Sequence, residues 1–456
     1  MCYTVGQMKV CLIQPRMGRR PMDTSLKARM APHLGLLTIA GILERLGHEV
    51  VLQNGNLRKI SIPEDVDLVG VTVTVDVLPQ AIDLARECRA RGIPVVAGGI
   101  GVTCDPTSAA PHFDAVCLGA AEGHWPQLMD DLARGCLEKV YETGPGFPGE
   151  RLEAPSFTHA DPMQCLYGNV IATSRGCPFA CDFCYNSVKG VRGGYRHRTV
   201  ASVLEEIRSK KTRHVMFIDD NFIGDLGFAR KLVEAMAPMG LTWNAAVSAN
   251  IINHPDLLDR MRETGCRSLF VGFESVNADS IAGVHKGQND VARYEQLVEM
   301  LHEREIMVNA SFVFGLDSDD ASVFRATLDW IVRNRIETVT SHILTPYPGT
   351  ALHARLKEEG RLTDTDLSHY DTAHVVYRPK GMSAEELYAG YLWIYREVYS
   401  WRNIFRRRPK AASQRMPYWM FNLLYRKYGC VTEALGKVIG FDRVGRLSRR
   451  LSYGLW

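Results

Sequence analysis

The stretch TSRGCPFACDFCYN, residues 173–186, places three cysteines within eight positions, with a glycine and a proline beside the first. Thiolates this close can ligate zinc, pair in a disulfide or hold an iron–sulfur cluster. Structural zinc sites need four ligands, commonly from two Cys-x-x-Cys pairs, and no second pair follows in this part of the sequence. An iron–sulfur cluster differs because one iron can stay open for another molecule. The pattern of Cys177, Cys181 and Cys184 therefore favours a cluster, with three structural cysteines on a loop as the alternative.

Upstream of these cysteines, short apolar runs alternate with amphipathic segments. KVCLIQP (9–15) and LVGVTVTV (68–75) have the pattern of buried strands, and LGLLTIAGILERLG (34–47) has that of a helix. Strands that alternate with helices predict an α/β domain with a doubly wound parallel sheet. We place this domain at residues 1–141, followed by a Gly- and Pro-rich linker at 142–165.

From residue 166 the alternation restarts, with six strand-like runs: LYGNVIATS, HVMFIDDNF, TWNAAVSANI, RSLFVGFES, IMVNASFVFGL and TVTSHILTP. These units predict a partial (β/α)6 barrel over residues 166–360, and a helical, aromatic-rich extension over 361–456. In barrels of this kind the reactive groups lie at the carboxyl ends of the strands. The three cysteines follow the first strand directly, so we expect them at that end.

Composition limits the classes of protein that fit. The 456 residues carry a net charge of +3, twelve scattered cysteines and no uninterrupted apolar run long enough to cross a bilayer. We therefore expect a cytoplasmic protein with reduced thiols and no membrane span. Residues 401–456 contain thirteen Lys and Arg against two acidic residues. This basic tail fits a solvated surface interleaved with aromatic packing residues, or a surface that binds nucleic acid or a membrane; nucleic acid is not expected as a partner.

The Cys-x-x-x-Cys-x-x-Cys spacing, with Phe183 and Tyr185 beside the last cysteine, resembles the signature of the radical S-adenosylmethionine (SAM) superfamily. On this resemblance, the three cysteines hold a 4Fe-4S cluster whose fourth iron binds SAM. One electron then cleaves SAM to a 5′-deoxyadenosyl radical, which abstracts hydrogen from an unactivated carbon. A doubly wound domain before such a barrel is similar to the cobalamin-binding branch, and HKGQN (285–289) to its hopanoid C-methylase subgroup.

Polar residues at the other strand ends are candidates for the remaining site. We interpret Asp219, Asp220 and Glu274 as candidate acid–base groups, because each ends a buried strand. The candidate cofactor- or substrate-binding residues share hydroxyl or amide groups at strand ends or inward-facing positions. They are Tyr185, Asn221, Ser248, Asn250, Ser275, Asn309 and Ser311, with Asn244, Ser341 and His342 as further lining residues.

A cobalamin site in the first domain is doubtful from the sequence. Cobalamin domains often carry Asp-x-His-x-x-Gly after the first strand, whereas PRMGRRPMDTSLKARM (15–30) has no histidine. Where relatives often show Gly-Gly-x-His, the chain has GGIGVT, with Gly101 in place of the histidine. Members that bind cobalamin without a protein ligand lack the first motif as well.

Two reactions fit this resemblance. The favoured one is radical dehydration of an aminoglycoside-type sugar diol, because the barrel strands offer a polar lining and the cobalt-ligand motifs are missing. The radical SAM dehydratase of the apramycin pathway, from antibiotic biosynthesis, is similar in architecture. The alternative is cobalamin-dependent C-methylation of a natural product, and a non-enzymatic iron–sulfur sensor is a third reading. Expected partners are a small polar substrate, a flavodoxin-type electron donor and, for dehydration, an NAD(P)H-dependent reductase.

Overall fold

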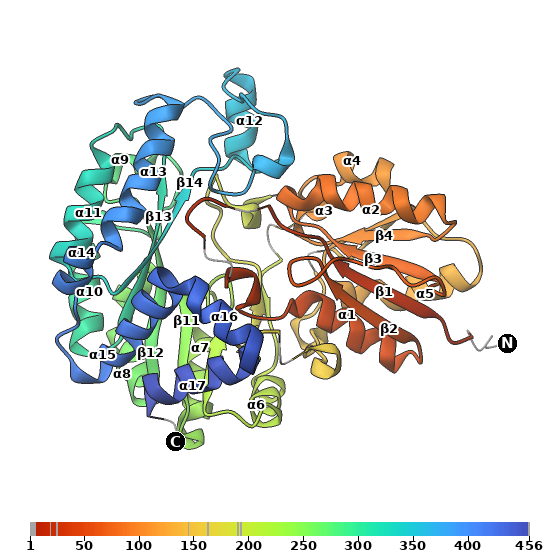
Figure 1. The fold of residues 1–456 in the computed structure, drawn as a ribbon, viewed down its shortest axis with the longest axis horizontal. Helices are drawn as coiled ribbons and strands as arrows, with labels where there is room; N and C mark the ends of the chain where they lie inside the picture. The colour runs from red at the N-terminus through yellow and green to blue at the C-terminus, as the bar shows by residue number, and fades with distance from the viewer. Residues whose placement is uncertain are drawn as a thin grey trace.

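The structure is a computed structural model that describes residues 6–18, 20–23, 26–144, 146–161, 164–188, 191 and 194–454. Figure 1 shows two α/β units side by side, with the first sheet on the right and the barrel on the left. The segment that carries the three cysteines runs between the two units. The C-terminal helices cross in front of the barrel and cover its lower half.

The first unit is a six-stranded sheet in which all neighbouring strands pair in parallel, in the order β2-β1-β3-β4-β5-β6. Its strands are β1 (Lys9–Gln14), β2 (Glu49–Asn54), β3 (Leu68–Thr72), β4 (Val95–Gly98), β5 (Ala115–Leu118) and β6 (Val140–Glu142). Its helices are α1 (Leu34–Arg45), α2 (Leu78–Ala90), α3 (Ile100–Cys104), α4 (Pro106–Ala109) and α5 (Trp125–Ala133).

Strand β1 explains why helices cover both faces of this sheet. Cys11 and Ile13 pack with α2 and α3, whereas Val10 and Leu12 pack with α1 and α5. Successive side chains of a strand point to opposite faces, so a strand that is apolar at every position needs a cover on each face. The doubly wound α/β fold predicted from the sequence is thereby confirmed.

The second unit is a six-stranded, all-parallel open barrel in the order β7-β10-β11-β12-β13-β14. Its strands are β7 (Val170–Ile171), β10 (His214–Phe217), β11 (Thr242–Ser248), β12 (Cys266–Glu274), β13 (Met307–Phe314) and β14 (Thr338–Ile343). Its helices are α6 (Val200–Ser209), α7 (Leu226–Met236), α8 (Pro255–Glu263), α9 (Ala278–Ala282), α10 (Tyr294–Glu303), α11 (Val323–Arg333) and α12 (Ala351–Glu358). A short antiparallel pair, β8 (Ser174–Arg175) and β9 (Arg196–His197), brackets the cysteine loop. The predicted partial barrel is confirmed.

The C-terminal part is helical, as predicted. It comprises α13 (Ala384–Val398), α14 (Trp401–Arg406), α15 (Ala412–Trp419), the π-helix η12 (Met420–Lys427), α16 (Gly429–Ile439) and α17 (Phe441–Tyr453). Two tyrosines of this part form hydrogen bonds to the backbone N–H and C=O groups of the edge strand β14. Tyr395 bonds through its hydroxyl to the backbone N–H and C=O of Ser341, and Tyr399 does the same at Val339. The last barrel strand therefore has no open edge along these residues.

The exact domain limits stay predictions, although the two sheets fall on the expected sides of the linker. The first sheet ends at Glu142 and the second begins at Val170. Within the described parts of the chain, no helix combines the length and the apolar content needed to cross a bilayer.

Candidate active site

The cysteine loop leaves strand β8 at Arg175 and lies between the two units. Gly176 turns the chain with a φ of +79°, a region that favours glycine. The loop is tied at several points. Asp182 accepts a 2.7 Å hydrogen bond from Nδ1 of His285, and the carbonyl of Asp182 accepts one from the backbone N–H of Leu352. These contacts hold the loop at the carboxyl ends of the barrel strands, the end predicted from the sequence.

The three thiols are close enough to influence one another electrostatically. Burial raises the pKa of Cys177 and of Cys181, and raises that of Cys184 to about 12. Among the described residues, no three Cys, His, Asp or Glu side chains are grouped as a preformed metal site. Metal binding would require the loss of the thiol protons. The donor set of three thiols on one loop fits an iron–sulfur cluster, and the assignment of these residues as ligands stays a prediction.

Residues of the segment HKGQN, which follows α9, contact the cysteine loop. Gln288 donates a hydrogen bond from Nε2 to the sulfur of Cys181 at 3.3 Å. Lys286 acts on the same thiol through its positive charge, which lowers the pKa of Cys181 against the effect of burial. Sequence reasoning cited HKGQN only as a likeness to relatives and missed both roles. The signal was a lysine and an amide in the short loop that follows α9.

Asp219 is buried and anchors the start of the cysteine segment. Its Oδ1 accepts four hydrogen bonds from the backbone N–H groups and hydroxyls of Thr173 and Ser174. Its Oδ2 has no hydrogen-bond partner among the described residues. Burial raises the pKa of Asp219 to about 6, against the lowering effect of those hydrogen bonds. One oxygen of this carboxyl group therefore positions the segment before the cysteines, and the other oxygen is free to accept a hydrogen bond.

The other two acid–base candidates are already engaged. Asp220 is exposed and accepts a 2.7 Å hydrogen bond from the hydroxyl of Tyr185, which brings two predicted site residues together. Glu274 is buried, has a φ of +65° and pairs with Lys286. The buried carboxylate of Glu274 is paired with Lys286 and holds that side chain beside the cysteine loop. The structure therefore supports a positioning role for Glu274.

Three predicted amide and hydroxyl residues form one chain of hydrogen bonds at the ends of β10 and β11. Asn221 donates from Nδ2 to Oγ of Ser248 at 3.1 Å, and Ser248 donates to Oδ1 of Asn250. Ser275 accepts a hydrogen bond from the backbone N–H of Asn277, which turns the chain after β12. Ser311 is buried in β13.

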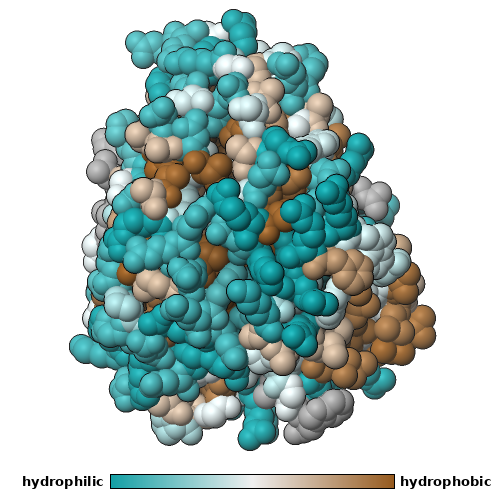
Figure 2. Space-filling model, turned by 90° about the vertical axis from the view of Figure 1, so that its left-hand side faces the viewer, coloured by the Kyte–Doolittle hydropathy of each residue, from teal (hydrophilic) through white to brown (hydrophobic). Residues whose placement is uncertain are grey.

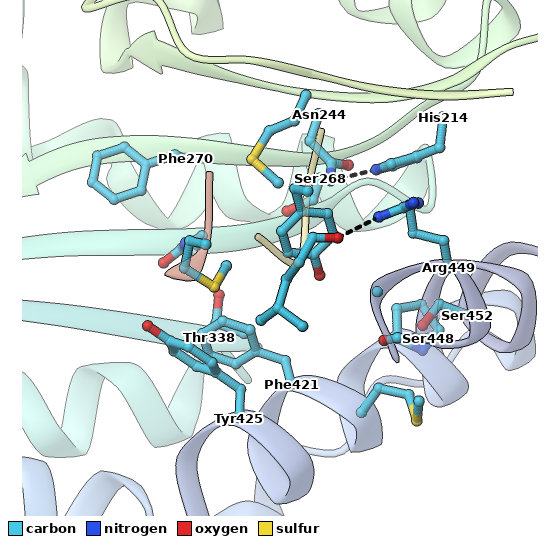
Figure 3. Close-up of a pocket in the computed structure, with 18 of the residues that line it drawn as sticks. His214, Asn244, Ser268, Phe270, Thr338, Phe421, Tyr425, Ser448, Arg449 and Ser452 are labelled. Carbon is cyan, nitrogen blue, oxygen red and sulfur yellow. Dashed lines mark hydrogen bonds between the residues drawn. The ribbon is translucent and has the colours of Figure 1, made fainter. Parts of the chain in front are cut away.

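A cavity of about 430 Å³ occupies the barrel interior. It extends from Ile218 and Asp219, beyond the end of β10, to Thr338 at the start of β14. One wall comes from the strands and mixes polar side chains with apolar ones such as Met216, Phe270 and Met307. Its labelled residues in Figure 3 include His214, Asn244 and Ser268. Asn309 lines the same cavity, and its Oδ1 is buried without a partner among the described residues.

The opposite wall of this cavity comes from the C-terminal helices and is largely apolar and aromatic. Phe421 and Tyr425 of η12 face the strands across the cavity (Figure 3), and Met420, Leu424 and Val444 lie beside them. Two residues from the first unit, Leu26 and Met30, add further apolar surface. The lining is thus mixed, whereas the sequence predicted a polar barrel interior. The strands themselves contribute apolar side chains, and the strand pattern contains no information about the aromatic helices that cover the barrel.

The first unit meets the cysteine loop through its carboxyl edge. Arg175 donates two hydrogen bonds to the buried carboxylate of Glu122, at 2.7 and 2.9 Å. The thiol of Cys104 lies 3.9 Å from the carbonyl oxygen of Tyr185. A ligand held at this edge of the first sheet would face the loop and the barrel mouth, which is the region where open α/β sheets bind ligands.

The structure explains the missing histidine signals at this edge. A Cβ added to Gly101 would lie 2.7 Å from the backbone of Thr74, so this glycine serves close packing of two backbone segments. His33 accepts the N-cap hydrogen bond of α1 from Leu36, and burial lowers its pKa. Gly101 has no side chain that could coordinate a metal, and Nδ1 of His33 is engaged in the cap of α1.

Comparisons with known proteins agree with both units. Residues 171–331 match the radical SAM superfamily, residues 28–128 match the B12-binding domain, and residues 350–433 match a domain of unknown function (DUF4070). The chain is 32% identical over 382 residues to the bacteriochlorophyllide d C-12(1)-methyltransferase of Chlorobaculum tepidum, covering 81% of this chain and 82% of that one. It is 29% identical over 302 residues to the hopanoid C-2 methylase of Rhodopseudomonas palustris, covering 63% and 56%.

A solved structure shares the fold. The radical SAM methyltransferase TsrM from Kitasatospora setae, with cobalamin and a 4Fe-4S cluster bound, superposes with a TM-score of 0.58 at 21% identity. The match covers 77% of this chain and 75% of that one. At this identity the likeness supports the fold, which has the same two-unit arrangement.

The fold and these matches define a radical SAM enzyme, a class that uses a 4Fe-4S cluster and SAM. Within that class, the chain belongs to the branch with an N-terminal B12-binding domain, which includes the hopanoid C-methylases. The expectation that cobalamin is doubtful is corrected by the B12-binding match over residues 28–128. The missing histidines had weighed too heavily, because cobalamin can be held by a sheet edge without a protein ligand to cobalt.

Proposed function

We propose that the protein is a cobalamin-dependent C-methyltransferase. The observation that carries this proposal is the position of the cysteine loop between the edge of the B12-binding unit and the barrel mouth, joined by the Arg175–Glu122 ion pair. A methyl donor in the first unit and a radical source on the loop would then share one space. Dehydration needs no such donor, and the relatives named above are a methyltransferase and a methylase, which favours methylation over the reaction preferred from the sequence.

The residues present fit the expected cofactors. Cys177, Cys181 and Cys184 would hold the cluster, and Gln288 would donate to a cluster sulfur. When bound, the cluster and SAM supply a 5′-deoxyadenosyl radical, and methylcobalamin supplies the methyl group. The chain's own residues orient these groups and keep water out. Asp219 holds the segment before the loop, and Tyr185 and Asp220 close its end.

The cavity favours a substrate with an extended apolar part. Phe421, Tyr425 and Leu424 would contact that part, while Asn244 and Asn309 would bond to polar groups on the opposite side. A wholly polar aminoglycoside would leave the aromatic wall without a partner. The relatives named above act on bacteriochlorophyllide d and a hopanoid. A substrate with a large ring system and a few polar groups is consistent with those names and with the mixed lining of the cavity.

One observation supports the second candidate function, dehydration. Asp219 lines the cavity with an unpartnered oxygen and a pKa raised to about 6, as a proton-transfer residue would need. Its other oxygen is occupied by four hydrogen bonds, which explains its burial without any proton transfer. A flavodoxin-type electron donor stays part of the proposal, and a reductase would be needed only for dehydration.

The experiment is an anaerobic turnover assay with SAM carrying a labelled methyl group and with added cobalamin. Substrate panels would contain polycyclic amphipathic compounds in one set and aminoglycosides in the other. We expect labelled methyl products from the first set, and loss of that activity in Phe421→Asp, with 5′-deoxyadenosine formation retained. Tyr388→Asp, at an exposed aromatic position of α13 that does not line this cavity, is the matched control. Products that lose water and gain no label would overturn the proposal.

A further inference from the structure

Helix α16 carries an apolar stripe on its outer face. Val431, Ala434, Leu435 and Val438 recur at the i, i+3, i+4, i+7 spacing of one helix face. In a surface helix this face normally packs on the core. Here all four residues are exposed, with 62% of Val431 and 81% of Val438 accessible to solvent. An apolar helix face turned outward marks a surface that binds something.

Helix α17 extends this surface with a mixture of apolar and basic side chains. Leu447 and Leu451 are exposed, as are Arg443, Arg446 and Arg450 at helical spacing, and Arg446 pairs with Asp442. In Figure 2 a brown hydrophobic patch at the right-hand edge lies on the side where Figure 1 draws α16. We call this surface, formed by the exposed faces of α16 and α17, the C-terminal apolar face. It lies within the segment that holds thirteen basic and two acidic residues.

Not every basic residue of this segment belongs to the face. Arg407 is fully buried and donates to the carbonyls of Ile336, Glu337 and Val398, so it is a structural residue. Arg449 donates to the carbonyl of Leu166 and lines the barrel cavity. The arginines at positions 443, 446 and 450 remain on the outside. The basic tail predicted from the sequence therefore divides into an inner structural set and an outer exposed set.

The inner side of the same two helices lines the barrel cavity. Thr432 of α16 and Val444, Ser448 and Ser452 of α17 face that cavity, as Figure 3 shows for the two serines. Leu424 of the preceding η12 both lines the cavity and is 40% exposed. Only one layer of helix thus separates the C-terminal apolar face from the space proposed for the substrate.

We propose that the C-terminal apolar face docks on the surface of a lipid bilayer that contains anionic lipids. Apolar side chains on a helix that lies in the interface insert between the headgroups, and neighbouring arginines contact the phosphates. Charge favours this occupant. Glu433 and Asp442 pair with Lys437 and Arg446, which leaves Arg443 and Arg450 as an excess of positive charge on the face. A second copy would bring these like charges together, and nucleic acid would leave the apolar stripe of α16 exposed. The proposal does not depend on the reaction catalysed, because binding to a bilayer needs no turnover.

The test is flotation of the full-length, cluster-loaded protein with vesicles under anaerobic conditions. One set of vesicles is phosphatidylcholine alone, and the other contains phosphatidylglycerol as well. We expect flotation with the anionic set and weaker flotation at high salt. Leu435→Glu combined with Val438→Glu should reduce the bound fraction about tenfold or more. The variant loses two apolar side chains that would insert into the bilayer, and it gains two negative charges that anionic lipids repel. Arg450→Gln should reduce it about fivefold.

Leu46→Glu is the matched control, because Leu46 is 44% exposed on the first unit, away from this face. It should float as the unchanged protein does. Equal iron content and equal SAM cleavage in all variants would show that each is folded. Equal flotation with both vesicle sets, or with none, would overturn the proposal. So would a dimer of the unchanged protein that the Leu435→Glu, Val438→Glu variant abolishes.

Discussion

The guanidinium of Arg175 donates two hydrogen bonds to the carboxylate of Glu122, across the boundary between the first unit and the barrel. The Glu122 side chain is 2% exposed and that of Arg175 is 37% exposed. Arg175 lies two residues before the first cysteine of the loop. The pair therefore sets where the loop begins relative to the edge that would hold cobalamin.

Glu122→Gln tests this role. The amide keeps the shape of the side chain and removes its charge, so we expect a loss of about 1–2 kcal/mol in the free energy of unfolding. We also expect less cluster after reconstitution, because the loop loses one anchor. Urea unfolding and iron content measure the two effects. Asp83→Asn, in the exposed pair with Arg86, should change neither. A full cluster content in Glu122→Gln would show that the pair does not position the loop.

The cluster ligands can be tested by single substitutions. Cys177→Ala, Cys181→Ala and Cys184→Ala should each abolish formation of 5′-deoxyadenosine and remove the reduced-cluster signal in electron paramagnetic resonance. Cys430→Ala is the control, because this thiol is exposed on α16. Cys266 is a poorer control, since it is fully buried and its removal leaves a cavity. Retention of the cluster signal in any of the three variants would reject that cysteine as a ligand.

Gln288→Leu should make the reduction potential of the cluster more negative. The Nε2–H of Gln288 donates to the sulfur of Cys181, and a donor at this place stabilises the extra negative charge of the reduced cluster. Anaerobic redox titration measures the change. Gln296→Leu, at an exposed position of α10, is the matched control. An unchanged potential in Gln288→Leu would mean that the hydrogen bond is lost when the cluster binds.

Asp219 predicts a pH dependence of stability. Its pKa is about 6 in the folded protein and about 4 in an unfolded chain. Between these values the folded protein holds a proton that the unfolded chain has released, so stability falls as the pH rises through this window. Asp219→Asn cannot titrate there. Relative to the unchanged protein, the stability of this variant should rise by about 2–3 kcal/mol from pH 4 to pH 7, by urea unfolding. Parallel profiles would contradict the raised pKa.

Much of the fold follows from local patterns of apolar residues in the sequence. The four apolar residues in the middle of β1 required cover on both faces, and the alternation of strands and helices indicated parallel sheets. Those periods are properties of neighbouring residues, so a single sequence reveals them. The cysteine spacing identified the class of enzyme for the same reason. The missing histidines were a misleading signal, since members of this branch can bind cobalamin without a protein ligand to cobalt and residues 28–128 match the B12-binding domain.

By itself, then, the sequence determined the two α/β units, the class of enzyme and the three thiols expected to hold its cluster. Only the tertiary structure decided what surrounds them. Gln288 reaches Cys181 across 107 positions of the chain, and Phe421 faces Asn244 across the cavity. Whether the apolar face of α16 points to the core or to solvent also depends on packing, because the same apolar stripe suits a buried or an exposed helix face. Contacts between distant segments are chosen by the packing of the whole chain, and no local period encodes them.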